Sequence, residues 1–226
     1  RFCFGRDSRS QPPRPPASAQ PLDMIDDMEG GEGAVEILFR LLCPSARIGS
    51  VIGKGGDIIK QLRADTSARI KVEEAVASAD ERVVTISGPD TPNAEWSPAQ
   101  EALFRVLSRI IEGDGEVDVP ANSAVVRLLV QSSQIGCILG KQGAIIKQMR
   151  EETGATIRVM PREALPPCAL ELDELVQVSG ELHTVRMALQ MISVRLRSNP
   201  MRGPLGGRLV GTVPPGLAAA AAAAAA

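Results

Sequence analysis

Residues 48–63 read IGSVIGKGGDIIKQLR, and residues 135–150 read IGCILGKQGAIIKQMR. The two stretches lie 87 positions apart (135 − 48). The same register holds without a gap between residues 39–72 and residues 126–159, and about half of the aligned residues are identical. An internal repeat of this kind is typical of a chain that contains one structural unit twice. The sequence therefore predicts two copies of one small domain.

Each stretch predicts a short helix, a tight glycine turn and a second helix. After the turn, Ile58, Ile59 and Leu62 fall at helical spacing and mark one buried face. Glycine suits the turn because it accepts positive φ and has no Cβ. A helix that begins behind such a turn presents free N–H groups and the positive end of its dipole, which attract a phosphate. Lys54 and Lys141 each follow the first glycine and add a cation.

Spacing excludes two other phosphate-binding glycine motifs. Only three residues separate Gly49 from Gly53, one fewer than a P-loop needs, and no Ser or Thr follows Lys54. A dinucleotide fingerprint needs glycine where Ile58 stands. The remaining alternative is a turn that serves only as a tight corner between helices. Its repetition in both copies, each time with lysine, argues against that alternative.

The hydrophobic pattern predicts the same order in both copies: strand, helix, helix, strand, strand, helix. In the first copy we expect elements at residues 35–41, 46–52, 57–65, 68–72, 82–87 and 99–112. In the second copy we expect strands at residues 125–131, 155–160 and 175–179 and a last helix through residues 182–196. Five additional residues separate the second and third strands of the second copy, since Val83 matches Leu175 at an offset of 92 instead of 87. This order is consistent with an α+β fold in which helices cover one face of a small antiparallel sheet.

The repeats carry an excess of positive charge, although the net charge of the 226 residues is −2. Residues 39–72 carry seven Lys or Arg against two Asp, and residues 126–159 carry five against two Glu. A basic face of this kind can bind phosphate on a slightly acidic chain. The aromatic content is 2% and there is no Tyr, so an aromatic platform for stacked bases is excluded.

The sequence carries no pattern that indicates catalysis or metal binding. No nucleophile–base pair or nucleotide-binding loop is visible, and we expect a non-enzymatic protein without cofactor or metal. No Cys-x-x-Cys pair occurs, and the lone His183 has no neighbouring ligand candidate, so free thiols are expected at Cys3, Cys43, Cys137 and Cys168. Without a signal-peptide pattern or a long apolar run, we expect a reducing intracellular compartment.

The repeated stretch resembles the signature of the KH domain, a module that binds RNA and single-stranded DNA. Within that family it is similar to the poly(C)-binding and hnRNP K-like group, and residues 97–103 and 173–180 look like its plant branch. The resemblance implies two tandem type I KH domains, each a three-stranded antiparallel sheet packed on three helices. We expect a disordered leader at residues 1–33, domains at 34–113 and 123–199, a linker at 114–122 and a disordered tail at 200–226.

The resemblance also implies a groove for about four nucleotides between the glycine-turn helices and the second strand with its variable loop. In the first copy the candidate residues are Ile48, Gly49, Val51, Ile52, Gly53, Lys54, Gly55, Gly56, Ile59, Arg63, Arg69, Ile70, Lys71 and Arg82. In the second copy they are Ile135, Gly136, Ile138, Leu139, Gly140, Lys141, Gln142, Gly143, Ile146, Arg150 and Arg158.

Base reading in poly(C)-binding relatives rests largely on two arginines, which Arg69 and Arg82 match. The first copy is therefore expected to prefer C-rich strands. The second copy has Thr156 and Glu174 at those positions, so its preference stays open, with Arg158 as a substitute.

The expected function is sequence-selective binding of single-stranded RNA in mRNA or pre-mRNA processing and post-transcriptional regulation. The expected location is the nucleus, with the cytoplasm as a second site. Alternatives are single-stranded DNA binding, a dimerisation or protein-interaction scaffold formed by the second copy, and a piece of an RNA-processing enzyme. The proline-rich residues 12–16 are a candidate ligand for an SH3- or WW-type partner, with a plain extended linker as the simpler interpretation. Trp96 is expected to pack locally instead of stacking on a base.

Overall fold

The computed structural model describes residues 35–91, 93–113 and 122–201. The expected leader, nearly all of the expected linker and nearly all of the expected tail lie outside these residues, as do Cys3 and the proline-rich stretch. The first domain contains β1 (Glu36–Pro44), α1 (Ile48–Ile52), α2 (Asp57–Thr66), β2 (Arg69–Val72), β3 (Glu81–Pro89) and α3 (Pro98–Glu112). The second contains β4 (Ser123–Gln131), α4 (Ser132–Leu139), α5 (Ala144–Thr153), β5 (Thr156–Met160), β6 (Asp173–Glu181) and α6 (Leu182–Ser198).

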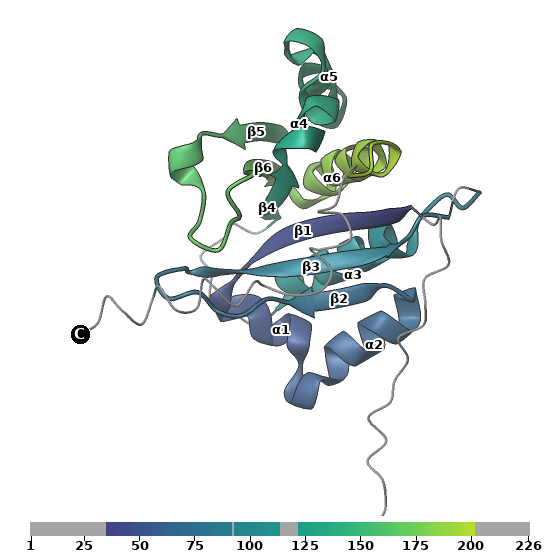
Figure 1. The fold of residues 1–226 in the computed structure, drawn as a ribbon, viewed down its shortest axis with the longest axis vertical. Coiled ribbons are helices and arrows are strands. Elements are labelled where there is room, and N and C mark those ends of the chain that lie inside the picture. Colours follow the sequence, from purple (N-terminus) through teal and green to yellow (C-terminus); the bar gives the residue numbers. More distant parts are fainter. Residues whose placement is uncertain (1–34, 92, 114–121, 202–226) are drawn as a thin grey trace, which may run out of the picture. The chain divides into compact units, whose positions relative to one another are not determined.

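Both copies have the predicted order of elements and the predicted α+β fold (Figure 1). In the first domain the strand order is β2-β3-β1, and in the second it is β4-β6-β5, with antiparallel pairing throughout. The third strand of each copy therefore lies at the centre of its three strands. This leaves the second strand of each domain, β2 or β5, at an outer edge.

The core lies between the sheet and the helices. Side chains alternate along a strand, and in β1 it is Ile37, Phe39 and Leu41 that pack with the apolar faces of the helices. Helix α3 begins with the predicted capping box, in which Ser97 and Gln100 exchange hydrogen bonds of 3.1 and 3.2 Å.

Two expectations on single side chains are confirmed. Trp96 packs edge-to-face on Phe104 with ring centroids 5.1 Å apart, as expected for a locally packed loop aromatic. Cys43, Cys137 and Cys168 are free thiols. Burial raises the pKa of the Cys43 thiol to about 12, so this group is not a reactive thiolate at neutral pH.

The two sheets are joined into one by pairing between β1 and β4, which the sequence did not predict. The paired residues are Arg40 with Leu129, Leu41 with Leu128, and Leu42 with Arg127. Leu41 and Leu128 are equivalent in the repeat (128 − 41 = 87), so the pairing is symmetric about this pair. The result is a six-stranded antiparallel sheet in the order β2-β3-β1-β4-β6-β5.

Candidate nucleic-acid interface

The first glycine of each turn is required by space as well as by backbone conformation. Gly53 has φ 76°, and a Cβ built there would lie 2.6 Å from Cγ1 of Ile58. Gly140 has φ 71°, and its Cβ would lie 2.5 Å from Cγ1 of Ile145. Real Cβ atoms do not approach a neighbour this closely, so any side chain would push the following helix away. The absence of a side chain at Gly53 and Gly140 therefore lets α2 and α5 pack closely against the turn.

The tip of the turn keeps its shape although the two copies differ there. Gly55 has φ 62° and Gln142 has φ 52°, so both lie in the left-handed region. A Cβ on Gly55 would meet no heavy atom within 4 Å, which agrees with the presence of a glutamine at the equivalent place. A non-glycine residue in this conformation costs roughly 1–2 kcal/mol. The second domain keeps the turn in spite of that cost.

Helices α2 and α5 begin directly at these turns. Their N-caps, Gly56 and Gly143, supply no side-chain hydrogen bond, and the N–H groups of Asp57 and Ala144 bond to the carbonyl oxygens of Lys54 and Lys141 within the turn. The positive end of each helix dipole nevertheless lies at the turn. Lys54 and Lys141 are exposed next to the turns. This arrangement of cation, helix N-terminus and small residues is suited to a phosphate group. Asp57 in the first turn of α2 weakens the attraction in the first domain, whereas α5 begins with an alanine.

The short helix before each turn provides an open surface. Gly49 and Gly136 are exposed, and a Cβ on either would meet nothing within 4 Å. The half-buried aliphatic side chains beside them are Ile48, Ile52, Ile135 and Leu139. These residues remain candidates for contact with a base.

Five other aliphatic candidates are corrected by the structure. They are core residues with at most 8% of their surface exposed: Val51, Ile59, Ile70, Ile138 and Ile146. Their side chains pack between the sheet and the helices, so they support the surface from below instead of contacting a base.

Arg63 and Arg150 are exposed and also make a contact that the sequence did not predict. Arg63 donates from Nε and Nη2 to the carbonyl oxygen of Ile70, at 2.9 and 2.5 Å. Arg150 donates from Nε to the carbonyl oxygen of Ile157 at 2.7 Å. Each guanidinium thus ties the second helix of its domain to the edge strand. These contacts set the distance between the glycine turn and that strand.

The two expected base readers of the first domain differ in availability. The Arg69 side chain is 68% exposed and lies 3.7 Å from a carboxylate oxygen of Glu36. Arg82 donates from Nε and Nη2 to the carbonyl oxygen of Glu73, at 3.0 and 2.6 Å. Arg69 is therefore free to meet a ligand, whereas the fork of Arg82 holds the start of the β2–β3 connection.

In the second domain the corresponding positions are less basic. Thr156 and Arg158 are both exposed on β5. Glu174 lies 4.0 Å from Arg162. Arg158 is thus the cation that the edge strand of the second domain presents.

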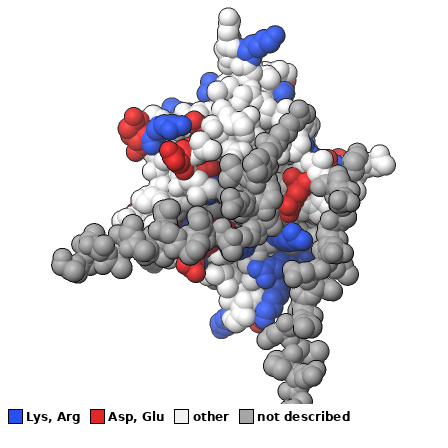
Figure 2. Space-filling model, viewed as in Figure 1, with Lys and Arg blue, Asp and Glu red and all other residues white. Residues whose placement is uncertain are grey.

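Cations gather over β2 and α2 of the first domain (Figure 2). The exposed Lys and Arg residues of these two elements are Lys60, Arg63, Arg69 and Lys71. Lys71 lies 2.8 Å from Glu73, and Lys60 Nζ lies 3.5 Å from the carbonyl oxygen of Gly55. The edge strand and the glycine turn therefore share one basic surface.

Sequence patterns missed the residues that hold the short helix α1 in place. Arg47 Nη1 donates to the carbonyl oxygen of Ile110 at 2.8 Å, and Ser50 Oγ donates to that of Arg109 at 2.7 Å. Arg109 Nε returns a bond of 3.2 Å to the carbonyl oxygen of Ser50. A helix of five residues is not stable alone, so these contacts with the end of α3 fix its position. No local signal reveals partners 59 residues apart.

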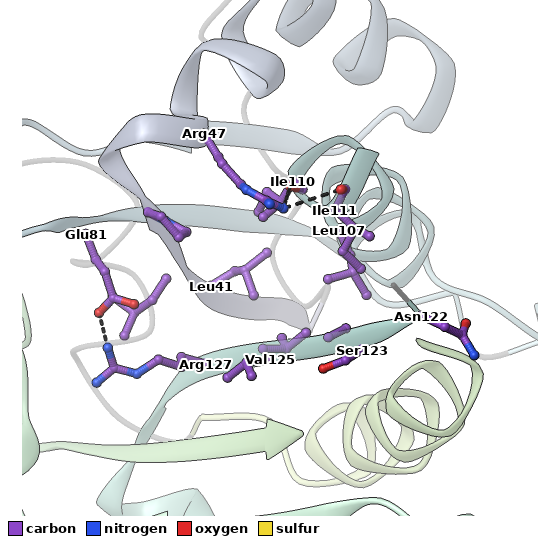
Figure 3. Close-up of a pocket in the computed structure, with 14 residues that line it drawn as sticks. Leu41, Arg47, Glu81, Leu107, Ile110, Ile111, Asn122, Ser123, Val125 and Arg127 are labelled. Atoms are coloured by element: carbon purple, nitrogen blue, oxygen red, sulfur yellow. Dashed lines mark hydrogen bonds and ion pairs between the residues drawn. The ribbon is translucent and has the colours of Figure 1, made fainter. Parts of the chain in front are cut away.

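A hollow of about 420 Å³ lies away from this surface, between β1, α3 and β4 (Figure 3). Its polar lining includes Arg47, Glu81 and Arg127, and the last two form an ion pair across the joined sheets. None of the candidate nucleic-acid residues lines this hollow. The candidate interface is an open surface elsewhere.

Comparison with known proteins decides the family. The KH domain family matches residues 38–95 and 125–194, which together cover more than half of the chain. The chain belongs to the KH domain family. Each matched segment contains one glycine turn with its edge strand and central strand.

The expected similarity to plant KH proteins is confirmed by three relatives from Arabidopsis thaliana. The KH domain-containing protein HEN4 is 37% identical over 76% of this chain and 21% of its own length. The RNA-binding KH domain-containing protein RCF3 is 42% identical over 73% of this chain and 28% of its own. The RNA-binding KH domain-containing protein PEPPER is 36% identical over 72% of this chain and 34% of its own length. This KH chain thus spans only about a fifth to a third of the length of these relatives.

A solved structure of an a/eIF2alpha-aDim2p-rRNA complex from Pyrococcus horikoshii is a more distant match. It is 18% identical and covers 77% of this chain and 92% of that chain, with a TM-score of 0.27. A superposition this poor has no bearing on the arrangement or the ligand of the present protein.

Proposed function

We propose that this KH chain is a non-catalytic protein that binds single-stranded RNA through the glycine-turn surfaces of both domains. The observation that carries the proposal is the turn itself, which has the same left-handed backbone in both copies although Gln142 replaces Gly55. The shared backbone keeps Lys54 and Lys141 at the same place beside a helix N-terminus in both domains, where a phosphate can bind. The names of two relatives, RCF3 and PEPPER, describe RNA-binding proteins and support this ligand.

The chemistry of the surface fits a single strand with exposed bases. Lys54 and the N-terminus of α2 attract the backbone phosphates, and Ile48 and Ile52 offer aliphatic contact to the bases. Arg69, exposed on the edge strand, can donate two hydrogen bonds to one base edge. We propose that the first domain prefers C-rich strands for this reason, and that the protein acts on mRNA or its precursors in the nucleus.

Fluorescence anisotropy with C-rich, U-rich and A-rich single strands, as RNA and as DNA, tests the proposal. The first variant combines Lys54→Asp with Gly55→Asp, and the second combines Lys141→Asp with Gln142→Asp. The left-handed tip tolerates a side chain, as Gln142 demonstrates, so both variants are expected to fold. Each changes the charge by about −3 and places carboxylates against phosphate, so affinity should fall at least about tenfold at low salt.

The matched control is Met187→Asp with Gln190→Asp and Val194→Asp. These residues are exposed on α6 and have no part in the candidate interface, and their replacement also changes the charge by about −3. Affinity should be nearly unchanged in this control. Equal losses of affinity in the control and test variants would show that the overall charge, and not the glycine turn, determines binding. Full binding by both test variants would overturn the proposal, and preference for DNA over RNA would change the ligand class.

A further inference from the structure

The five additional residues of the second copy lie in the connection between β5 and β6, residues 161–172. This β5–β6 connection has a defined course. Backbone hydrogen bonds close turns from Ala164 to Pro161 at 3.0 Å and from Ala169 to Pro166 at 2.9 Å. A further bond joins Ser132 N to the carbonyl oxygen of Leu172 at 2.9 Å. The connection is therefore built into the domain instead of extending freely from the edge strand.

The β5–β6 connection packs on residues of both domains. Leu42 and Val83 of the first domain and Leu129 and Leu175 of the second form a separate apolar cluster, with at most 4% of each side chain exposed. We call these four residues the junction cluster. Leu165, Cys168 and Ala169 of the connection pack against the junction cluster, together with Met160 of β5.

The junction cluster lies on the face of the sheet that the helices do not cover. Leu41 and Cys43 belong to the core under the helices, and Leu42 between them points the other way because side chains alternate along a strand. Without the β5–β6 connection, aliphatic side chains on both sides of the β1–β4 pair would face water. Covering them stabilises the joined sheet through the hydrophobic effect.

Asp173 links the same connection to the first domain by polar contacts. Its Oδ2 accepts a hydrogen bond of 2.7 Å from the N–H of Leu170 and also pairs with Arg40 of β1. The carboxylate is only 5% exposed. The equivalent pair, Glu81 with Arg127, crosses the sheet symmetrically (127 − 40 = 87; 173 − 81 = 92). One buried carboxylate thus holds both the connection and the neighbouring domain.

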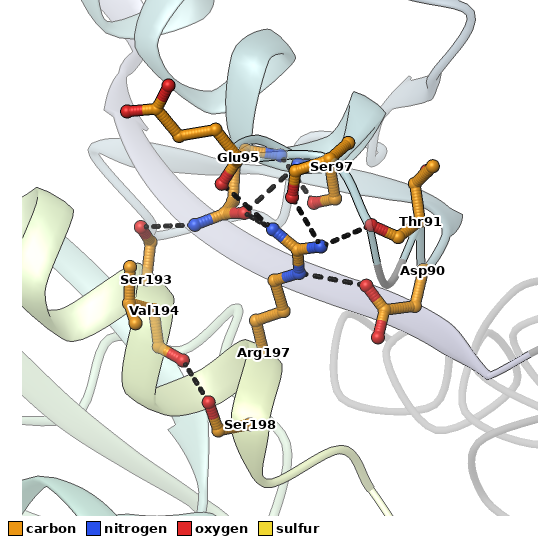
Figure 4. A network of polar contacts seen from close by, with 10 residues as sticks. Asp90, Thr91, Glu95, Ser97, Ser193, Val194, Arg197 and Ser198 are labelled. Carbon is orange, nitrogen blue, oxygen red and sulfur yellow. Dashed lines mark hydrogen bonds and ion pairs between the residues drawn. The ribbon is translucent and has the colours of Figure 1, made fainter.

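The first domain has its own additional segment, which contacts the second domain on the helical side. Strand β6 runs directly into α6, whereas residues 90–97 separate β3 from α3. Arg197 of α6 donates to Asp90 Oδ1 at 2.8 Å and to the carbonyl oxygens of Thr91 and Glu95 at 2.6 and 3.0 Å. Figure 4 shows its guanidinium pointing into this β3–α3 connection, and the side chain is only 13% exposed.

Both segments that break the repeat therefore contact the other domain. We propose that the β5–β6 and β3–α3 connections lock the two KH domains into one folding unit. We further propose that the β5–β6 connection serves this purpose instead of lining the nucleic-acid surface of the second domain. Leu165, Cys168 and Ala169 pack against the junction cluster, so these side chains point away from a strand bound at β5, whereas Leu170 and Leu172 are exposed. This second proposal rests on the proposed function, because it presupposes that the second domain has a nucleic-acid surface beside β5.

Amide hydrogen exchange in the full chain tests the lock. The variants are Leu165→Ser in the β5–β6 connection and Arg197→Gln in α6. Their matched controls are Leu170→Ser, whose side chain is 44% exposed, and Arg162→Gln, whose side chain is 62% exposed. Among residues 40–42 and 127–129, the amides that face the β1–β4 pairing exchange by separation of β1 from β4, and the others face β3 or β6, because N–H groups alternate between the two neighbours of a strand. Each lock variant should raise the exchange rate of the amides that face the β1–β4 pairing at least about tenfold, with α2 and α5 unchanged.

Exchange of the amides that face the β1–β4 pairing as slow in both lock variants as in the controls would overturn the lock. Faster exchange everywhere would also overturn it, because it would indicate general destabilisation. Both readouts are independent of RNA, so they remain decisive if the protein does not bind RNA at all.

RNA binding tests the second part of the proposal. Leu165→Ser is combined with Lys54→Asp and Gly55→Asp, so that binding reports on the second domain. Affinity should stay within about twofold of the same chain with Leu165 intact. A loss of tenfold or so would show that the β5–β6 connection lines the second nucleic-acid surface.

Discussion

At the scale of single residues, the candidate interface depends on a few positions where backbone and side chain have no freedom. The first glycine of each turn cannot carry a Cβ, whereas the tip of the turn can. Arg63 and Arg150 are bound to the edge strand, and Arg69 is exposed. Residues of the same type in one motif thus serve different purposes. For the arginines, the hydrogen-bond partners show which purpose each one serves.

Gly53 and Gly55 of the first turn should respond differently to replacement by alanine. Gly53→Ala places a Cβ 2.6 Å from Ile58 in addition to a left-handed backbone. We expect a loss of about 3 kcal/mol in the free energy of unfolding. Gly55→Ala meets no neighbour and should lose only about 1 kcal/mol. Urea unfolding of both variants checks this, and equal losses would contradict the steric argument.

Arg69 and Arg82 should separate binding from stability. Arg69→Ala removes an exposed guanidinium, so affinity for a C-rich strand should fall about tenfold with little change in stability. Arg82→Ala removes two hydrogen bonds to the Glu73 carbonyl and should lower stability by about 1 kcal/mol. Anisotropy and urea unfolding on the same samples measure both effects. If Arg82→Ala lost affinity as strongly as Arg69→Ala without losing stability, Arg82 would be a base reader as the sequence predicted.

At the scale of elements, short segments become ordered through contacts with long ones. Helix α1 has five residues and is held by α3, and β2 has four residues and is held by Arg63 of α2. The long helix α3 is defined by its own sequence, because it has a capping box and a continuous apolar face. The candidate ligand surface is thus built from short elements that depend for their order on contacts with the longer helices.

The cap of α3 should therefore affect more than its own helix. Ser97→Ala removes the hydroxyl that accepts the N–H of Gln100, at a site that is fully buried. We expect a loss of about 1–2 kcal/mol in the free energy of unfolding. Ser133→Ala, at an exposed position in the first turn of α4, is the matched control and should change stability by less than about 0.5 kcal/mol. Thermal or urea unfolding measures both, and a neutral Ser97→Ala would refute the role of the cap.

At the scale of the whole molecule, the six-stranded sheet changes how two binding domains are coupled. The β1–β4 pairing, two symmetric ion pairs and the two connections hold the domains together. The β1–β4 pairing also occupies the edges of both strands. Another chain could therefore not pair with these edges, and a dimerisation scaffold would need a different surface. No described helix has both the length and the apolar character needed to cross a membrane.

Lengthening the linker should consequently have little effect on binding. Insertion of about thirty Gly and Ser residues after Val117 would lower a linker-set effective concentration about ninefold. We expect the affinity for a long C-rich strand to stay within about twofold, because strand pairing and not the linker sets the distance between the domains. The same insertion with Leu165→Ser and Arg197→Gln should weaken binding. A large loss in the otherwise unchanged chain would contradict the fixed pairing.

The sequence by itself determined the repeat, the glycine turns, the order of the elements and the KH family. These features depend on residues close together in the chain: the period of the apolar positions, the glycines and the cap at Ser97. It also indicated the surface on which Lys54 and Arg69 lie.

The tertiary structure alone decided which candidates are exposed and how the copies are joined. Val51 and Ile70 belong to segments that the sequence assigned to the nucleic-acid surface, yet both are buried between the sheet and the helices. Arg40 meets Asp173 across 133 positions, and Arg197 meets Asp90 across 107. Contacts over such distances leave no period or spacing in the sequence, since they arise only when the β1 edge meets its equivalent in β4.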